Sequence, residues 1–100
     1  MVFIEEKSFL VVSAYADKIS ERFNRTDFCP DGLLKKQIWQ QDSKQEYITV
    51  KAVFFWQSRE AYKAWKKSPE HLAAHQNKPA EQPDYIKEVK AAMYWLNAEI

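Results

Sequence analysis

Glycine, cysteine and histidine are scarce in this sequence of 100 residues, and each shortage excludes a class of site. Gly32 is the only glycine, whereas a dinucleotide-binding fingerprint, a phosphate-binding loop and a nucleophile elbow each need at least two. Cys29 is the only cysteine, so no intrachain disulfide, multi-cysteine zinc site or self-sufficient iron–sulfur site can form. His71 and His75 are the only histidines, too few for a three-histidine zinc centre.

An excess of one charge and long hydrophobic runs are also lacking. Fifteen basic and fourteen acidic side chains leave a net charge of +1, which argues against a nucleic-acid partner bound through charge. Residues 1–4 are apolar, but charged residues follow at 5–7, so we expect neither a signal peptide nor a membrane span. The sequence therefore predicts a cytoplasmic protein with no membrane partner, folded as a single domain over 1–100.

Aromatic residues are abundant, with four Trp, five Tyr and six Phe. Large rings fill small cores, and they also line cavities for flat ligands, so composition alone leaves both interpretations open.

The hydrophobic pattern predicts an α+β fold. Alternation with a period of two predicts four strands, at 2–12, 33–41, 47–56 and 86–98. A first helix follows Ser13 as its N-cap, and a second follows Ser58. Ser68-Pro69 breaks the second helical region and starts a short helix at 69–76. The order strand, helix, strand, strand, helix, strand is that of the ferredoxin-like split βαβ fold, with an antiparallel sheet covered by helices on one face.

The open face of this sheet predicts an oligomer. The strands at 47–56 and 86–98 are apolar on much of both faces, although helices can cover only one. A second copy packed on the open face would bury the rest, so we expect a homodimer. The first strand carries charge in its middle, at Glu5 and Lys7, so that region is either exposed or borders a polar cavity. Glu5 and Glu6 are adjacent on a strand, face opposite ways and cannot form a carboxylate pair.

Few residues are candidates for chemistry. His71 and His75 lie four apart on a predicted helix and point the same way. This arrangement suits two ligands of one metal, a single axial ligand to haem iron, or two ordinary helix residues. Trp65 precedes them across the helix break, where it either shares a cavity with His75 or fills the core. Acidic neighbours disfavour a thiolate at Cys29, so we expect no nucleophilic role there.

Residues 55–65, followed by Ser68 and by the Ala-Ala-His of 73–75, resemble the helical region of the antibiotic-biosynthesis-monooxygenase (ABM) superfamily. Within it they are most similar to the Isd-type haem-degrading monooxygenases. The helix at 19–23 and the turn at 31–33 fit the same family. The resemblance implies a dimeric ferredoxin-like α/β barrel, and an enzyme that opens the porphyrin of haem with O2. Haem would be both substrate and cofactor, and an external donor would supply electrons, because the chain has no flavin or nicotinamide motif.

The same resemblance assigns roles to single residues. By position, His75 would ligate the haem iron, and Trp65 would press on the macrocycle and ruffle it. The family asparagine on the first strand corresponds to Lys7, which brings a full charge and a desolvation cost in place of a neutral amide. The resemblance therefore also admits a cofactor-free oxygenase of quinol-like aromatics, or a catalytically silent ligand-binding relative.

An RNA-recognition module has the same order of elements. Its third strand needs glycines between aromatics, and residues 47–56 contain none, which argues against this alternative.

Overall fold

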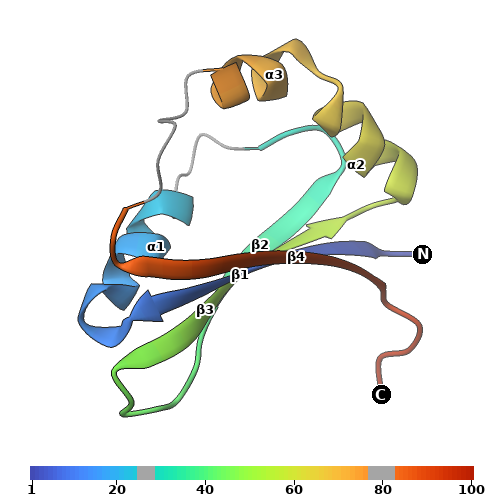
Figure 1. The fold of residues 1–100 in the computed structure, drawn as a ribbon. Helices are drawn as coiled ribbons and strands as arrows, with labels where there is room; N and C mark the ends of the chain where they lie inside the picture. Colours follow the sequence, from blue (N-terminus) through green and yellow to red (C-terminus); the bar gives the residue numbers. More distant parts are fainter. Residues whose placement is uncertain (25–28, 77–82) are drawn as a thin grey trace.

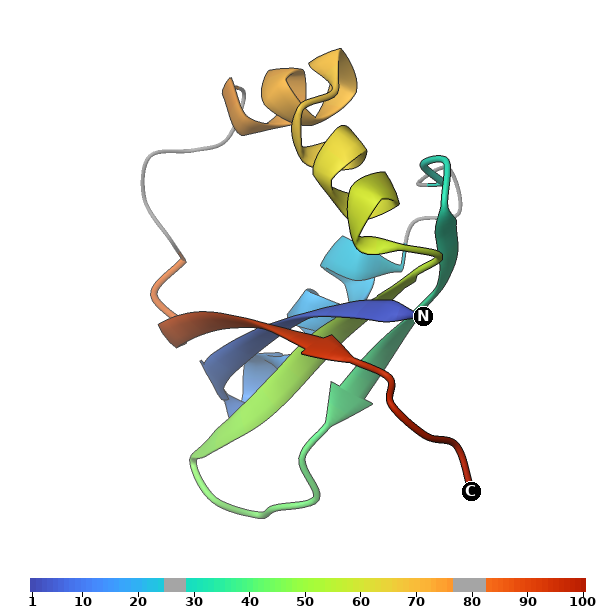
Figure 2. The same ribbon diagram turned by 90° about the vertical axis from the view of Figure 1, so that its right-hand side faces the viewer.

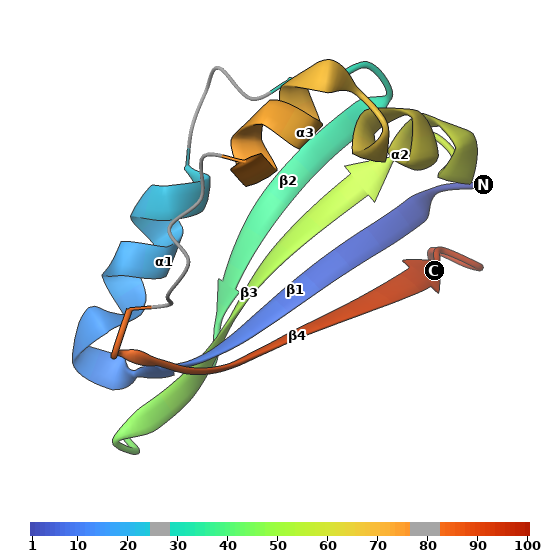
Figure 3. The ribbon, with the colours of Figure 1, turned by 45° about the horizontal axis from the view of Figure 1, so that its top comes forward.

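The computed structural model describes residues 1–24, 29–76 and 83–100, with only the backbone for 73–76. The elements in chain order are β1 (Phe3–Val12), the 3-10 helix η1 (Ser13–Tyr15), α1 (Ala16–Phe23), β2 (Leu33–Gln40), β3 (Tyr47–Trp56), α2 (Arg59–Lys66), α3 (Pro69–Gln76) and β4 (Ile86–Trp95). The sheet order is β2-β3-β1-β4, and every neighbouring pair is antiparallel. The three helices lie on one side of the sheet (Figures 1 and 3). The predicted ferredoxin-like fold is confirmed.

The core lies between the sheet and the helices, and β3 forms its centre. The predicted apolar face of β3 is buried along its whole length, at Ile48, Val50, Ala52, Phe54 and Trp56. Because β3 pairs with β1 and β2 on its two sides, neither of its edges is free. Helix α1 adds Ala16 and Ile19 to this core, and α2 adds Tyr62. These side chains bury the helix-facing side of the two central strands.

The edge strand β4 differs from the centre because most of its side chains are exposed, Ile86 being the buried exception. Val89, Met93 and Trp95 are exposed there, although they share the helix-facing side with their β1 partners Phe9, Glu5 and Phe3. Figure 2 shows β4 at the margin of the sheet, with α2 and α3 rising on the far side of β1. The uncovered apolar row follows from this placement of the helices.

Two boundary predictions were wrong. Ser13 does not cap α1: the chain passes through η1, and α1 begins at Ala16 with no side-chain cap. The backbone N–H groups of Val12 and Ser13 donate to Tyr85 O (2.9 Å) and Glu46 O (2.8 Å), which holds the chain to neighbouring segments before it can turn into a helix. The last strand ends at Trp95 rather than 98, because Trp95 pairs with Phe3, where β1 begins. Most of the loop expected at 77–84 lies outside the described residues.

Candidate functional site

The break between α2 and α3 is built around one hydroxyl. Ser68 Oγ donates to Trp65 O (2.7 Å) at the end of α2 and accepts from His71 N (3.2 Å) in the first turn of α3. Ser58 caps α2 in the ordinary way, because Ser58 Oγ accepts from Ala61 N (3.1 Å). Both predicted caps are confirmed. The shared hydroxyl fixes the direction in which α3 leaves α2.

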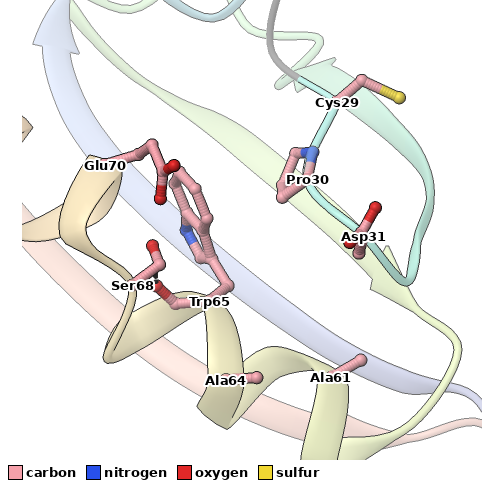
Figure 4. A pocket seen from close by; sticks show the side chains of 8 residues that line it. All are labelled: Cys29, Pro30, Asp31, Ala61, Ala64, Trp65, Ser68 and Glu70. Atoms are coloured by element: carbon pink, nitrogen blue, oxygen red, sulfur yellow. Dashed lines mark hydrogen bonds between the residues drawn. The ribbon is translucent and has the colours of Figure 1, made fainter.

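A cavity of about 480 Å³ lies between this helical arm and the turn that precedes β2. Figure 4 shows Trp65, Ser68 and Glu70 on the helical side, with Cys29, Pro30 and Asp31 facing them across the gap. Among the residues that the structure describes, the lining consists of Cys29, Pro30, Asp31, Ala61, Ala64, Trp65, Ser68 and Glu70. The cavity therefore combines one large indole with small alanine side chains and two carboxylates.

The far wall depends on Gly32. Its φ of +85° lies in the left-handed region, and a Cβ placed there would collide with Ala61 Cβ on α2. Leu33 N donates to Pro30 O (3.1 Å) to close the turn, and Gln57 N donates to Gly32 O (2.7 Å) to tie it to the end of β3. The single glycine of the chain thus lets the turn approach α2 closely enough to form a wall.

A buried charged cluster lies beneath α2. Glu5 is 5% exposed on the helix-facing side of β1, and its Oε2 accepts from Lys66 Nζ at 3.3 Å. Tyr62 contacts the same carboxylate. Burial, the negative charge of Glu5 and a side-chain hydrogen bond to Glu5 together raise the pKa of Tyr62 to about 12. The charged middle of β1 is therefore not exposed. Its carboxylate, that of Glu5, is buried and paired with Lys66.

Glu6 shows the opposite arrangement. Its Oε1 lies 3.0 Å from Lys51 Nζ and 3.0 Å from Ser8 Oγ, on the face of the sheet that the helices leave open. The prediction that Glu5 and Glu6 face opposite ways is confirmed.

Trp65 lines the cavity and also packs against the core. Its ring meets that of His71 edge to face, with centroids 5.2 Å apart. His75 lies in α3, but its side chain is outside the described residues. The structure thus brings His71 to Trp65, and the roles assigned to Trp65 and His75 stay predictions.

Lys7 lies on β1 between Ala52 of β3 and Ala91 of β4, on the face that carries Glu5 and Phe9. Lys7 is half-buried and lies on the helix-facing side of the sheet, not on the open face. It is not among the residues that line the cavity containing Trp65.

Cys29 is exposed with a free thiol. Within residues 1–24, 29–76 and 83–100, no three His, Cys, Asp or Glu side chains converge on a metal-sized site. No helix in those same ranges has the length and apolarity to cross a bilayer.

Sequence reasoning missed Tyr62 and Lys66 as the partners of Glu5, and missed the contact between Gly32 and Ala61. A charge at a strand position that alternates with buried Phe3 and Phe9 was the available signal for the first. No local sequence pattern indicates the contact between Gly32 and Ala61, because that contact depends on where α2 lies.

The fold and the aromatic-walled cavity define a small α+β protein of the ferredoxin-like type. Residues 31–77 match the antibiotic biosynthesis monooxygenase family. The predicted resemblance to this family is confirmed over that part of the chain. The chain is 28% identical to the haem-degrading monooxygenase HmoA of Bacillus subtilis, over 97% of this chain and 93% of that protein.

Solved structures agree with this resemblance. A Bacillus cereus protein described as an antibiotic biosynthesis monooxygenase superposes with a TM-score of 0.85 at 28% identity, over 99% of this chain and 96% of that one. The haem degrader MhuD of Mycobacterium tuberculosis, with two haems bound in its active site, gives a TM-score of 0.69 at 20% identity, over 98% of each chain. SnoaB of Streptomyces nogalater, a cofactor-independent oxygenase, gives 0.64 at 12% identity, over 99% of this chain and 96% of that one. The last two show a shared fold only.

Proposed function

We propose that this chain is a monooxygenase whose substrate is haem, and that it opens the porphyrin oxidatively with O2 and electrons from an external donor. The observation that carries the proposal is the indole of Trp65 forming a wall of the cavity where α2 gives way to α3, the helix that holds His75. The likeness to HmoA over nearly the whole chain supports the same substrate.

The residues of the cavity fit a flat macrocycle on its apolar side. Trp65 offers a broad ring face, and Ala61 and Ala64 leave space beside it. In this proposal His75 would hold the iron through a neutral imidazole. Asp31 and Glu70 would repel the two propionates, so we expect those groups to point away from both carboxylates.

A haem titration followed by turnover tests the proposal. We expect the Soret band of haem to shift on binding, and reductant with air to convert bound haem to a linear tetrapyrrole. Trp65→Ala should weaken haem binding, whereas Trp39→Ala, a substitution of an exposed Trp outside this cavity, should leave it unchanged. An unshifted Soret band at saturating protein would reject haem as the substrate. A shifted band with haem intact after many equivalents of reductant would leave binding without degradation.

The second candidate is a cofactor-free oxygenase of quinol-like aromatics. The two carboxylates in the cavity wall favour a neutral guest over an anionic one, and SnoaB, a cofactor-independent oxygenase, has the same fold. Oxygen consumption with a quinol in protein free of haem, reduced by Trp65→Ala, would favour this candidate over the first.

The open face of the sheet supports a homodimer. Trp39, Tyr47 and Tyr94 are each between 38% and 48% exposed there, although they are large aromatic residues. A second copy packed on this face would bury them. Light scattering should give twice the mass of 11.9 kDa, and Tyr94→Glu should shift the protein to that single mass. A monomer at high concentration would reject the dimer without affecting the assignment of the cavity.

A further inference from the structure

We infer that Glu5 is a positioning residue. It fixes the rotation of α2 on the sheet and thereby sets the orientation of the Trp65 ring in the cavity. The carboxylate of Glu5 is buried, and its partner Lys66 directly follows Trp65 in the last turn of α2. The inference rests on the proposed function only for the importance of Trp65. The position of the ring itself is testable without any ligand.

The helix contacts Glu5 at two points rather than one. Lys66 Nζ lies 3.3 Å from Glu5 Oε2, and Tyr62, one turn earlier on α2, shares a side-chain hydrogen bond with the same carboxylate. Residues four apart lie on the same side of a helix. Because two successive turns bind one fixed group on β1, the helix can neither rotate about its axis nor slide without losing a contact.

The side chains around this carboxylate hold the arrangement rigid. The ring of Tyr62 packs on Phe3 (centroids 5.2 Å apart) and on Trp56 (5.8 Å). The ammonium of Lys66 lies 5.4 Å from the centroid of the Tyr62 ring, within the range of a cation–π contact. The carboxylate, the phenol and the ammonium therefore form one connected cluster between β1 and α2.

Helical geometry carries this constraint to Trp65. Successive residues of an α-helix project about 100° apart around its axis, so Lys66 can reach the sheet while Trp65 faces the cavity. Ser68 Oγ holds the Trp65 carbonyl from the other end. Removing the Glu5 contacts would free rotation of the turn that carries the indole.

Stability alone does not explain a charge at this position. A buried ion pair adds little stability over well-packed apolar residues, because desolvation offsets most of the attraction. Phe3 and Phe9, on the same face of β1, show that apolar side chains fit that layer of the core. An apolar residue at position 5 could not form directional contacts with two points on α2.

The chain contains a matched control. Glu6 is the next residue, and its ion pair with Lys51 (3.0 Å) lies on the open face, away from α2. Lys51 is the cross-strand partner of Trp39. Glu5→Gln and Glu6→Gln therefore remove the same charge from neighbouring residues, and each lies near a different tryptophan.

Fluorine NMR of the ligand-free protein labelled with 5-fluorotryptophan tests the inference. Single Trp→Phe variants assign the four resonances. We expect Glu5→Gln to shift and broaden the Trp65 resonance and to leave that of Trp39 in place, whereas Glu6→Gln should do the reverse. Lys66→Arg, which keeps the charge, should leave the Trp65 resonance near its original position, and Lys66→Gln should move it.

A Trp65 resonance that stays unchanged in both Glu5→Gln and Lys66→Gln would overturn the inference. Lys66 is partly exposed, so Lys66→Gln keeps the test valid if Glu5→Gln does not fold. In a haem titration, Glu5→Gln should weaken binding about tenfold, since misplacing a contact group by about 1 Å is costly, and Glu6→Gln should not. If Trp65 moves but no variant, nor the parent protein, binds haem, the positioning role stands and the proposed substrate is wrong.

Discussion

Trp65 and His71 meet edge to face across the break between α2 and α3, with ring centroids 5.2 Å apart and planes inclined at 64°. Trp65 lies in the last turn of α2, and His71 lies in the first turn of α3. Ser68, between them, bonds to the backbone of both. The contact therefore gives His71 a packing role beside Trp65.

The two histidines should behave differently toward haem. We expect His75→Ala to abolish the Soret shift on titration, because the proposed iron ligand is lost. His71→Ala should keep the shift and alter the fluorescence of Trp65, its neighbour. An unchanged Soret shift in His75→Ala would remove that residue from the ligand role, and loss of the shift only in His71→Ala would transfer the role to His71.

Gly32 and Ala61 should show strong coupling in stability. Gly32→Ala places a methyl group against Ala61 Cβ at a φ of +85°, so we expect a loss of about 1–3 kcal/mol in the free energy of unfolding. Ala61→Gly removes the collision but not the backbone strain. The double variant should therefore be less destabilised than the sum of the two single changes, as measured by urea unfolding. Simple additivity would show that the turn does not pack on α2.

Tyr62 should make the protein sensitive to alkali. Burial and the nearby Glu5 carboxylate raise the pKa of Tyr62 to about 12 from its ordinary value of 10.0. A tyrosine whose pKa is raised by folding stabilises the folded state at pH values below its ordinary pKa. That contribution is lost as the pH rises through the raised pKa. A shift of this size corresponds to roughly 2–3 kcal/mol.

The free energy of unfolding should therefore fall more steeply between pH 10 and pH 12 in the parent protein than in Tyr62→Phe. The matched control is Tyr94→Phe, which alters an exposed tyrosine on the opposite face of the sheet. Glu5→Gln should lower the pKa of Tyr62 toward its ordinary value, as seen in the absorbance titration of the phenolate. Parallel pH profiles for the parent protein and Tyr62→Phe would contradict the account.

Local patterns were sufficient to predict the framework of the fold. The alternation of β3 is complete because both of its edges are paired and one face is buried, so sequence period and structure coincide. The Ser68-Pro69 break was also predictable from a local pattern, because capping involves residues within one turn of each other.

What the sequence did not predict depends on distant segments. Glu5 has its partners on α2, so no local pattern shows that the charge is buried and paired. Ser13 has the right side chain for a cap, but hydrogen bonds to Tyr85 and Glu46 hold the chain there in another path. The closeness of Gly32 to Ala61 likewise results from how α2 packs.

The two serine caps should differ in their effect on the site. Ser58→Ala and Ser68→Ala each remove a side-chain cap, so each should cost about 1 kcal/mol in the free energy of unfolding. Ser68→Ala also removes the bond to Trp65 O. Native-state hydrogen exchange should therefore show faster exchange at His71 N in Ser68→Ala and at Ala61 N in Ser58→Ala. Only Ser68→Ala should weaken haem binding. Equal haem affinity in the two variants would show that the break does not organise the site.

Lys7 offers a test of whether charge limits turnover. It is half-buried on the helix-facing side of β1, between Ala52 and Ala91. A neutral amide at this position can donate a hydrogen bond without the desolvation cost of an ammonium. We expect Lys7→Asn to raise the rate of haem degradation by about tenfold, which is less than the roughly 10²–10³-fold that one donor contributes in an oxyanion hole.

Lys7→Met separates the two effects of that change, because it removes the charge without supplying a donor. A gain in Lys7→Asn alone would show that the amide matters, whereas equal gains in both variants would show that the ammonium was inhibitory. Rates equal to that of the parent protein in both would show that Lys7 does not limit the reaction, and the cause of any slow turnover would then lie on the side of Trp65 and His75.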